Sequence, residues 1–106
     1  MTYLKSYTTF GEHIRTLRET AGLTLKEVAE NVEIDISLLA KIERNERQPT
    51  KKLIKNISNY FKVDDKELFN EFLSDQIAYK ILDEEADLNV LKVAERKIKY
   101  GITKLK

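Results

Sequence analysis

The amino-acid sequence predicts an all-α protein, a five-helix bundle followed by a C-terminal helical hairpin. Apolar residues recur at spacings of three and four along most of the chain, which is the period of an amphipathic helix. Thr9, Thr24 and Asp64 each precede a glutamate by three positions, a pattern typical of the capping box that opens a helix. The segments between the expected helices are only a few residues long, and sustained strand alternation is missing.

The first expected helix follows the capping pair Thr9 and Glu12. Its apolar positions are separated by four, three and four residues, so they share one face. They are Phe10, Ile14, Leu17 and Ala21. Gly22 is expected to end the helix, because glycine readily adopts the left-handed conformation that closes one.

The segment from residue 23 to residue 47 contains two short amphipathic stretches separated by a few non-periodic residues. Thr24 and Glu27 are expected to open the first, and Asp35 is expected to cap the second. Their apolar positions are Val28, Ala29 and Val32 in the first stretch and Leu38, Leu39 and Ile42 in the second. This length pattern is that of a helix-turn-helix, whose second helix can lie in the major groove of DNA.

Two further helices complete the expected bundle. Thr50 is expected to cap the fourth, and Asp64 with Glu67 is expected to open a short fifth. Their apolar positions are Leu53, Ile54, Ile57, Tyr60 and Phe61, and then Leu68, Phe69 and Phe72. We therefore predict a domain over residues 1–72 and an extension over residues 73–106.

The extension carries apolar residues at helical spacing on both sides of an acidic run at residues 83–87. They are Leu73, Ile77, Ile81, Leu88, Leu91 and Ile98. We predict a helical hairpin, although Ile77, Tyr79 and Ile81 also alternate as a strand would. This apolar seam either packs onto the core of its own chain or forms the interface of a homodimer, and we expect the second use at least in part.

Composition limits the class of protein. The chain has 106 residues and no cysteine, which excludes disulfides and thiolate metal sites. Its 19 basic and 18 acidic residues nearly balance, so only the distribution of charge can indicate a partner. No apolar run is long enough to be a signal peptide or to cross a bilayer, and we expect a cytoplasmic protein with no membrane partner.

From Phe10 to about Phe69 the sequence resembles the phage-repressor-like (Xre/Cro) helix-turn-helix family of transcription regulators. The matching segments are FGEHIRTLRETAGLT, KEVAENV, LLAKIERNERQPT and LIKNISNYFKVDDKELF, with the spacing of the family and without gaps. The resemblance covers more than half of the chain. It implies a bundle of five helices that binds double-stranded DNA, usually as a homodimer over two half-sites.

The resemblance also implies which residues face the bases. The matching positions are Ile36, Ser37 and Lys41. Family members often carry arginine, glutamine or asparagine at such positions, and commonly a glutamine at the position of Leu25, where it contacts phosphate. Ile36 offers only apolar contact, for example to a thymine methyl group. Packing in the core or between subunits is an equal alternative for Ile36 and Leu25.

Phosphate contacts are expected from a basic segment between Lys41 and Lys55, which has six basic residues and two acidic ones. The predicted phosphate contacts include four basic residues of this segment, a threonine that caps a helix and a glutamine in a loop. They are Arg44, Arg47, Lys51 and Lys52, with Thr24 and Gln48. The alternative is that these charges only solvate a helix face. In the family, residues that match Arg18 and Glu43 form a structural ion pair between the first helix and the recognition helix.

Other chemistries have little support in the sequence. His13 is the single histidine and has no companion ligands at metal spacing, and the acidic run lacks regular oxygen-ligand spacing. The three glycines form no phosphate-binding loop, and no nucleophile has a matching base. We expect no catalysis, cofactor, metal or small-molecule ligand. The sequence therefore predicts a homodimeric regulator on a near-palindromic operator, with an antitoxin-like or adaptor module of weak DNA specificity as the alternative.

Overall fold

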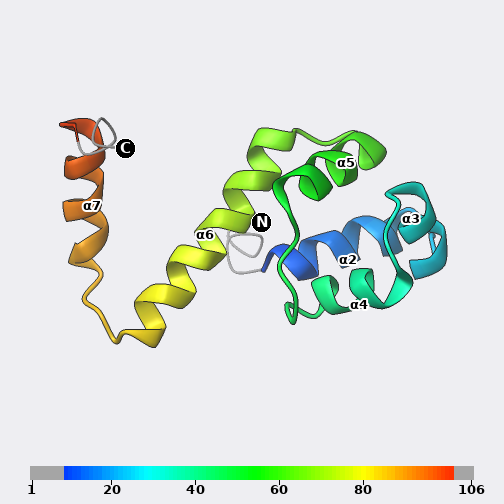
Figure 1. Ribbon diagram of the computed structural model, residues 1–106, viewed down its shortest axis with the longest axis horizontal. Helices are drawn as coiled ribbons and strands as arrows, with labels where there is room; N and C mark the ends of the chain where they lie inside the picture. Colours follow the sequence, from blue (N-terminus) through cyan, green and yellow to red (C-terminus); the bar gives the residue numbers. More distant parts are fainter. Residues whose placement is uncertain (1–8, 102–106) are drawn as a thin grey trace. The chain divides into compact units, whose positions relative to one another are not determined.

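The computed structural model describes residues 9–101, which form six α-helices and no strand (Figure 1). The helices are α2 (Phe10–Thr20), α3 (Leu25–Asn31), α4 (Ile36–Glu43), α5 (Lys51–Phe61), α6 (Asp65–Asp83) and α7 (Asn89–Lys99). The all-α prediction is confirmed. Residues 77–82 lie within α6, so the strand alternative is wrong.

Helix α6 is longer than expected, because it joins the predicted fifth helix to the first half of the predicted hairpin. No glycine or proline lies between residues 65 and 83, so nothing in the backbone ends the helix near residue 72. The chain divides into two compact units, residues 1–75 and residues 76–106. The division therefore falls inside α6, after residue 75. The sequence predicted a boundary after residue 72.

The caps at the helix starts mostly follow the sequence. Thr9 with Glu12 and Thr24 with Glu27 both form reciprocal capping boxes, and the Thr50 hydroxyl accepts the backbone N–H of Leu53. Two expectations need correction. Asp35 occupies the N-cap of α4 without a side-chain hydrogen bond. Asp64 is expected from the sequence to form a capping box with Glu67, but its carboxylate accepts the backbone N–H of Lys66.

The core of the N-terminal unit is formed by α2–α5 and the first turn of α6. Its buried members come from the apolar faces that the sequence predicted. They are Phe10, Ile14, Val28, Ala29, Val32, Leu39, Ile42, Leu53, Ile54, Ile57 and Leu68. The rings of Phe10 and Phe72 meet edge to face at 5.6 Å, which adds an aromatic contact between α2 and α6.

The start of α2 lies directly against the end of α4. A Cβ atom on Gly11 would come within 2.4 Å of the Ile42 carbonyl oxygen and 2.7 Å of the Glu43 carbonyl oxygen. The Gly11 N–H donates to the Asn45 side-chain oxygen at 3.1 Å, and the Asn45 amide donates to the Thr9 hydroxyl at 2.8 Å. Only glycine allows this close approach of two backbones.

Polar contacts also hold α2 against α6. His13 pairs with Glu71 through its Nδ1 atom, and the Phe10 N–H donates to the Asp75 carboxylate at 2.6 Å. His13 is thus half-buried and has a partner within the fold. Partial burial raises the pKa of Asp75, although the hydrogen bond from Phe10 opposes this, and the nearby charges of Glu71 and Glu12 raise the pKa further.

Asp75→Asn should raise the melting temperature at pH 7. Because the folded state raises the pKa of Asp75, the contribution of this group to stability is present at low pH and is lost as the pH rises through the folded pKa. Asparagine removes the charge and keeps an oxygen for the Phe10 N–H. Thermal melts at pH 7 and near pH 3 should show the gain only at pH 7. Asp65→Asn, at an exposed carboxylate in the first turn of α6, is the control and should bring no gain.

The C-terminal unit buries very little. Helix α7 has no buried residue. Of the predicted seam, Ile81 is half-buried, and the other five members are exposed: Leu73, Ile77, Leu88, Leu91 and Ile98. None of the helices in the described residues is long and apolar enough to span a membrane.

Candidate nucleic-acid interface

Helices α3 and α4 form the predicted helix-turn-helix, with residues 32–35 as the turn (Figure 1). The turn contains Glu33 in the left-handed conformation, with φ of 62°. The Ile34 N–H donates to the Ala29 carbonyl at 3.0 Å, which ties the turn back to α3. Leu39 and Ile42 bury the inner face of α4, so its opposite face is fixed outward.

The outward face of α4 carries the three residues expected to read bases. Ile36 is 45% exposed, and Ser37 and Lys41 are also exposed. Ile36 and Ser37 belong to the first turn, and Lys41 follows Ser37 by four residues, which places them on neighbouring parts of one surface. The structure therefore leaves all three side chains exposed on α4, with Ser37 and Lys41 one turn apart on the same face.

The two unusual apolar residues have different environments. Leu25 is half-buried and packs against the core, so the packing alternative applies to it. Ile36 is exposed in the single chain and is not part of the core cluster. Ile36 is thus available for contact with a partner, whereas Leu25 supports the start of α3.

Arg18 and Glu43 join α2 to the last turn of α4. Arg18 donates from Nε to Glu43 Oε2 at 2.7 Å and from Nη2 to Oε1 at 3.0 Å, a bidentate arrangement. Its Nη1 atom also donates to the Leu23 carbonyl at 3.0 Å. The exposed fractions of the two side chains are 12% and 5%. The hydrogen bond to Glu43 raises the pKa of Arg18, so the guanidinium stays charged.

The basic segment after α4 carries less free charge than the sequence suggests. Arg44 pairs with Glu46 through Nε and Nη2, at 3.0 and 3.2 Å, and both side chains are exposed. The hydrogen bond from Arg44 lowers the pKa of Glu46 and keeps it ionised. Arg47 and Gln48 are exposed in the loop that follows. Thr24 is also exposed, but its hydroxyl and N–H are engaged in the capping box with Glu27.

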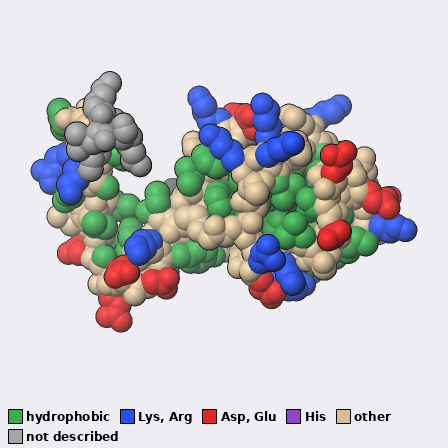
Figure 2. Space-filling view, viewed as in Figure 1, with side chains coloured by type: hydrophobic (Ala, Val, Ile, Leu, Met, Phe, Trp, Pro, Cys, Tyr) green, Lys and Arg blue, Asp and Glu red, His purple; other side chains and the backbone are tan. Residues whose placement is uncertain are grey.

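Lysines gather in a cleft between α5 and the start of α6. The cleft has a volume of about 530 Å³, and its lining contains four lysines and one carboxylate. The lining residues are Lys51, Lys52, Ile54, Lys55, Asp65, Lys66 and Phe69. The Lys51 ammonium lies 4.9 Å from the centre of the Phe69 ring, a distance typical of a cation–π contact. Figure 2 shows Lys and Arg side chains gathered over α5 and the start of α6. This lysine cleft is suited to phosphate groups.

Lys66 has no counterpart among the contacts predicted from the sequence. It lies 14 positions after Lys52, outside the basic segment, and reaches the lysine cleft only because α6 packs beside α5. A basic residue in the first turn of a helix carries no local signal of such a role.

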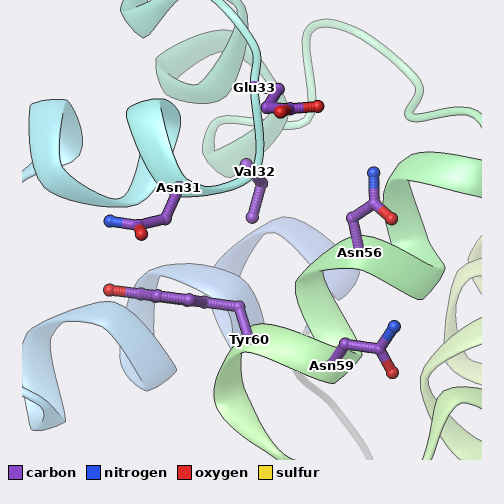
Figure 3. Close-up of a pocket in the computed structure, with 6 residues that line it drawn as sticks. All are labelled: Asn31, Val32, Glu33, Asn56, Asn59 and Tyr60. Carbon is purple, nitrogen blue, oxygen red and sulfur yellow. The ribbon is translucent and has the colours of Figure 1, made fainter.

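A second hollow, of about 340 Å³, lies between the end of α3 and α5 (Figure 3). Its lining residues are Asn31, Val32, Glu33, Asn56, Asn59 and Tyr60. Tyr60 extends from α5 beneath the end of α3 towards Asn31. The lining contains a carboxylate and no basic side chain, so this hollow suits an anion less well than the lysine cleft.

No group of three or more His, Asp or Glu side chains that could hold a metal ion occurs within residues 9–101. The acidic residues near the end of α6 instead serve local structure. Lys80 pairs with Glu84 at 3.3 Å, and the Asp87 carboxylate accepts the N–H of Asn89 at 2.8 Å.

Comparison with known proteins agrees with this geometry. The sequence matches a family described as a helix-turn-helix domain over residues 11–71, which is more than half of the chain and includes α3, α4 and the lysine cleft. No curated protein matches the chain. The matched range and the arrangement of α3 and α4 show that the chain belongs to this helix-turn-helix family of DNA-binding proteins.

Proposed function

We propose that this protein is a phage-repressor-like (Xre/Cro) transcription regulator that binds double-stranded DNA as a homodimer at a near-palindromic operator. The observation that carries the proposal is that Ile36, Ser37 and Lys41 are all exposed on α4, the second helix of a helix-turn-helix. The proposed role is binding and not catalysis.

In this mechanism, the N-terminal part of α4 enters the major groove and its exposed side chains meet the base edges. Ile36 contacts a thymine methyl group, and the short Ser37 hydroxyl accepts or donates a hydrogen bond without strong preference. Lys41 is the long cationic side chain of the set and donates to guanine acceptors. Sequence preference at the contacted positions then depends most on Lys41.

Phosphate contacts fix the position of α4 on the duplex. Arg47 and Gln48 are exposed in the loop after α4, and Lys51, Lys52 and Lys66 line the cleft that follows. Each lysine that neutralises a phosphate releases a counterion, so affinity falls steeply as salt rises. Arg44 contributes only when it exchanges the Glu46 carboxylate for a phosphate.

Regulation follows from where the operator lies. A two-fold dimer places two α4 helices about one helical turn of DNA apart, which matches a near-palindromic site. Protein bound at the operator blocks or assists transcription, depending on where the operator lies relative to the promoter. The concentration of the protein is then the controlling variable.

A second candidate function is a protein-interaction module, antitoxin-like or adaptor-like, with weak DNA specificity. The exposed Ile36 favours it, because an apolar side chain in the first turn of α4 also suits a protein surface. The lysine cleft beside α5 favours the DNA-binding regulator.

Fluorescence anisotropy with the DNA upstream of the protein's own gene separates the two candidates. At two salt concentrations, a regulator should bind this DNA far more tightly than a shuffled duplex and should show a steep salt dependence. Weak binding that does not depend on sequence would overturn the proposal.

Lys41→Ala and Lys51→Ala should weaken DNA binding in different ways. Lys41→Ala should cost about 1–3 kcal/mol on the preferred duplex and relax the preference at one position. Lys51→Ala, and likewise Lys66→Ala, should weaken all duplexes about equally and reduce the salt slope by about 1. Arg15→Ala, at an exposed residue of α2, is the control. Identical behaviour of the Lys41 and Lys51 variants would contradict the assigned division of roles.

A further inference from the structure

Helix α7 exposes an apolar stripe that the described residues of its own unit, 76–101, leave uncovered. Leu91, Ala94 and Ile98 follow one another at spacings of three and four, and Leu88 precedes them at the N-cap. Leu88, Leu91 and Ile98 are 70%, 44% and 58% exposed. A helix of 11 residues is marginal in water by itself, and apolar surface is unfavourable there, so the stripe needs a cover.

The charges on either side of this stripe favour a second copy of the chain as the cover. Four acidic residues precede α7: Asp83, Glu84, Glu85 and Asp87, of which Glu84 pairs with Lys80 and Asp87 accepts the N–H of Asn89. Three basic residues lie in its last turn, Arg96, Lys97 and Lys99, and Lys99 also pairs with Glu95 of the same helix at 3.4 Å. Two such segments that run antiparallel bring the acidic end of each towards the basic end of the other. Two that run parallel bring like charges together, which is unfavourable.

We propose that α7 packs antiparallel against α7 of a second copy, about a two-fold axis near Ala94. The proposal rests on the homodimer of the proposed function and adds its contact helix and orientation. An isologous interface of this kind uses the same patch on both chains. Ala94 at the centre of the stripe allows the helices to approach closely, with Leu91 and Ile98 packing on either side.

Cysteine cross-linking of the full chain tests the orientation, because the chain contains no cysteine of its own. Ala94→Cys lies near the axis and should give a disulfide-linked dimer under mild oxidation. Ile98→Cys should not form a linked dimer. Position 98 lies four residues from the axis, so its Cα atoms in the two copies are about 12 Å apart along the helices, beyond the ~7 Å that a disulfide spans. Leu88→Cys lies farther from the axis and should also stay unlinked. An equal mixture of the Leu88→Cys and Ile98→Cys chains should form the linked heterodimer.

Each other outcome counts against the proposal. Linked homodimers of all three variants, with no heterodimer in the mixture, would show parallel helices. No linkage in any variant or in the mixture would show that a second copy does not cover α7. If the unmodified chain binds its duplex as expected, either result overturns the α7 contact and leaves DNA binding standing.

Charge exchange tests the same pairing without cysteine. Asp83→Lys with Glu85→Lys, and separately Arg96→Glu with Lys97→Glu, should each lower the dimer fraction in sedimentation at low salt. Mixing the two variants should restore it, because each acidic end then meets a basic one. Failure of the mixture to recover, while circular dichroism shows that the helices are retained, would contradict charge pairing between the copies.

Discussion

Replacing Arg18 with alanine should lower the free energy of unfolding by about 3–5 kcal/mol, because it leaves the buried Glu43 carboxylate without its partner. The same range is expected for Glu43→Ala, which strands the guanidinium. Urea denaturation monitored by circular dichroism measures both effects. Both substitutions should also weaken DNA binding, because the pair joins α2 to the last turn of α4.

The double variant Arg18→Met with Glu43→Leu should be closer in stability to the natural protein than either single alanine variant, because it removes both charges and keeps the volume filled. Arg15→Ala provides a matched control on the same helix. Its pair with Glu19 is exposed, so its loss should cost less than about 1 kcal/mol. A small effect of Arg18→Ala, similar to that of Arg15→Ala, would show that the buried pair contributes little.

Replacing Gly11 with alanine should destabilise the protein by about 1–3 kcal/mol, although alanine is the better helix former by about 1 kcal/mol. The new Cβ would meet the carbonyl oxygens of Ile42 and Glu43, so α2 and α4 must move apart. Because those atoms belong to the backbone, no rotation of a side chain can relieve the contact. Thermal and urea unfolding measure the loss.

Thr16→Ala, at an exposed position of α2, is the control and should change stability little. Asn45→Gly removes the third close atom, the Asn45 side-chain oxygen, and should not rescue Gly11→Ala, because the two carbonyl contacts remain. An alanine variant as stable as the natural protein would show that α2 and α4 can separate at no cost.

The parts of the fold that the sequence predicts well are those with local causes. The capping boxes at Thr9 and Thr24 and the hydroxyl cap at Thr50 involve residues three positions apart. The apolar faces of α2–α5 follow from the 3.6-residue period of the α-helix. The continuity of α6 was missed because the expected boundary after residue 72 came from a change in character and not from a residue that breaks a helix.

The candidate site depends more on contacts between distant residues. Arg18 and Glu43 are 25 positions apart, and only the resemblance to a family suggested their pair. Nothing in the sequence suggested that Glu46 pairs with Arg44, that Lys66 joins the lysines of α5, or that Asp75 accepts the N–H of Phe10. The contacts of Lys66 and Asp75 arise from how the helices pack, which periodicity does not describe, whereas Arg44 and Glu46 are only two positions apart after α4. The environments of Leu25 and Ile36 likewise required the folded chain.

Asn45 has a consequence for the entropy of association. It lies in the loop after α4 with φ of 62°, and its side chain is held by Gly11 and Thr9 at the start of α2. The loop that leads to Arg47 is therefore ordered when the protein folds and not when it meets a partner. A surface preorganised in this way loses less conformational freedom on binding, so more of each phosphate contact would appear as affinity.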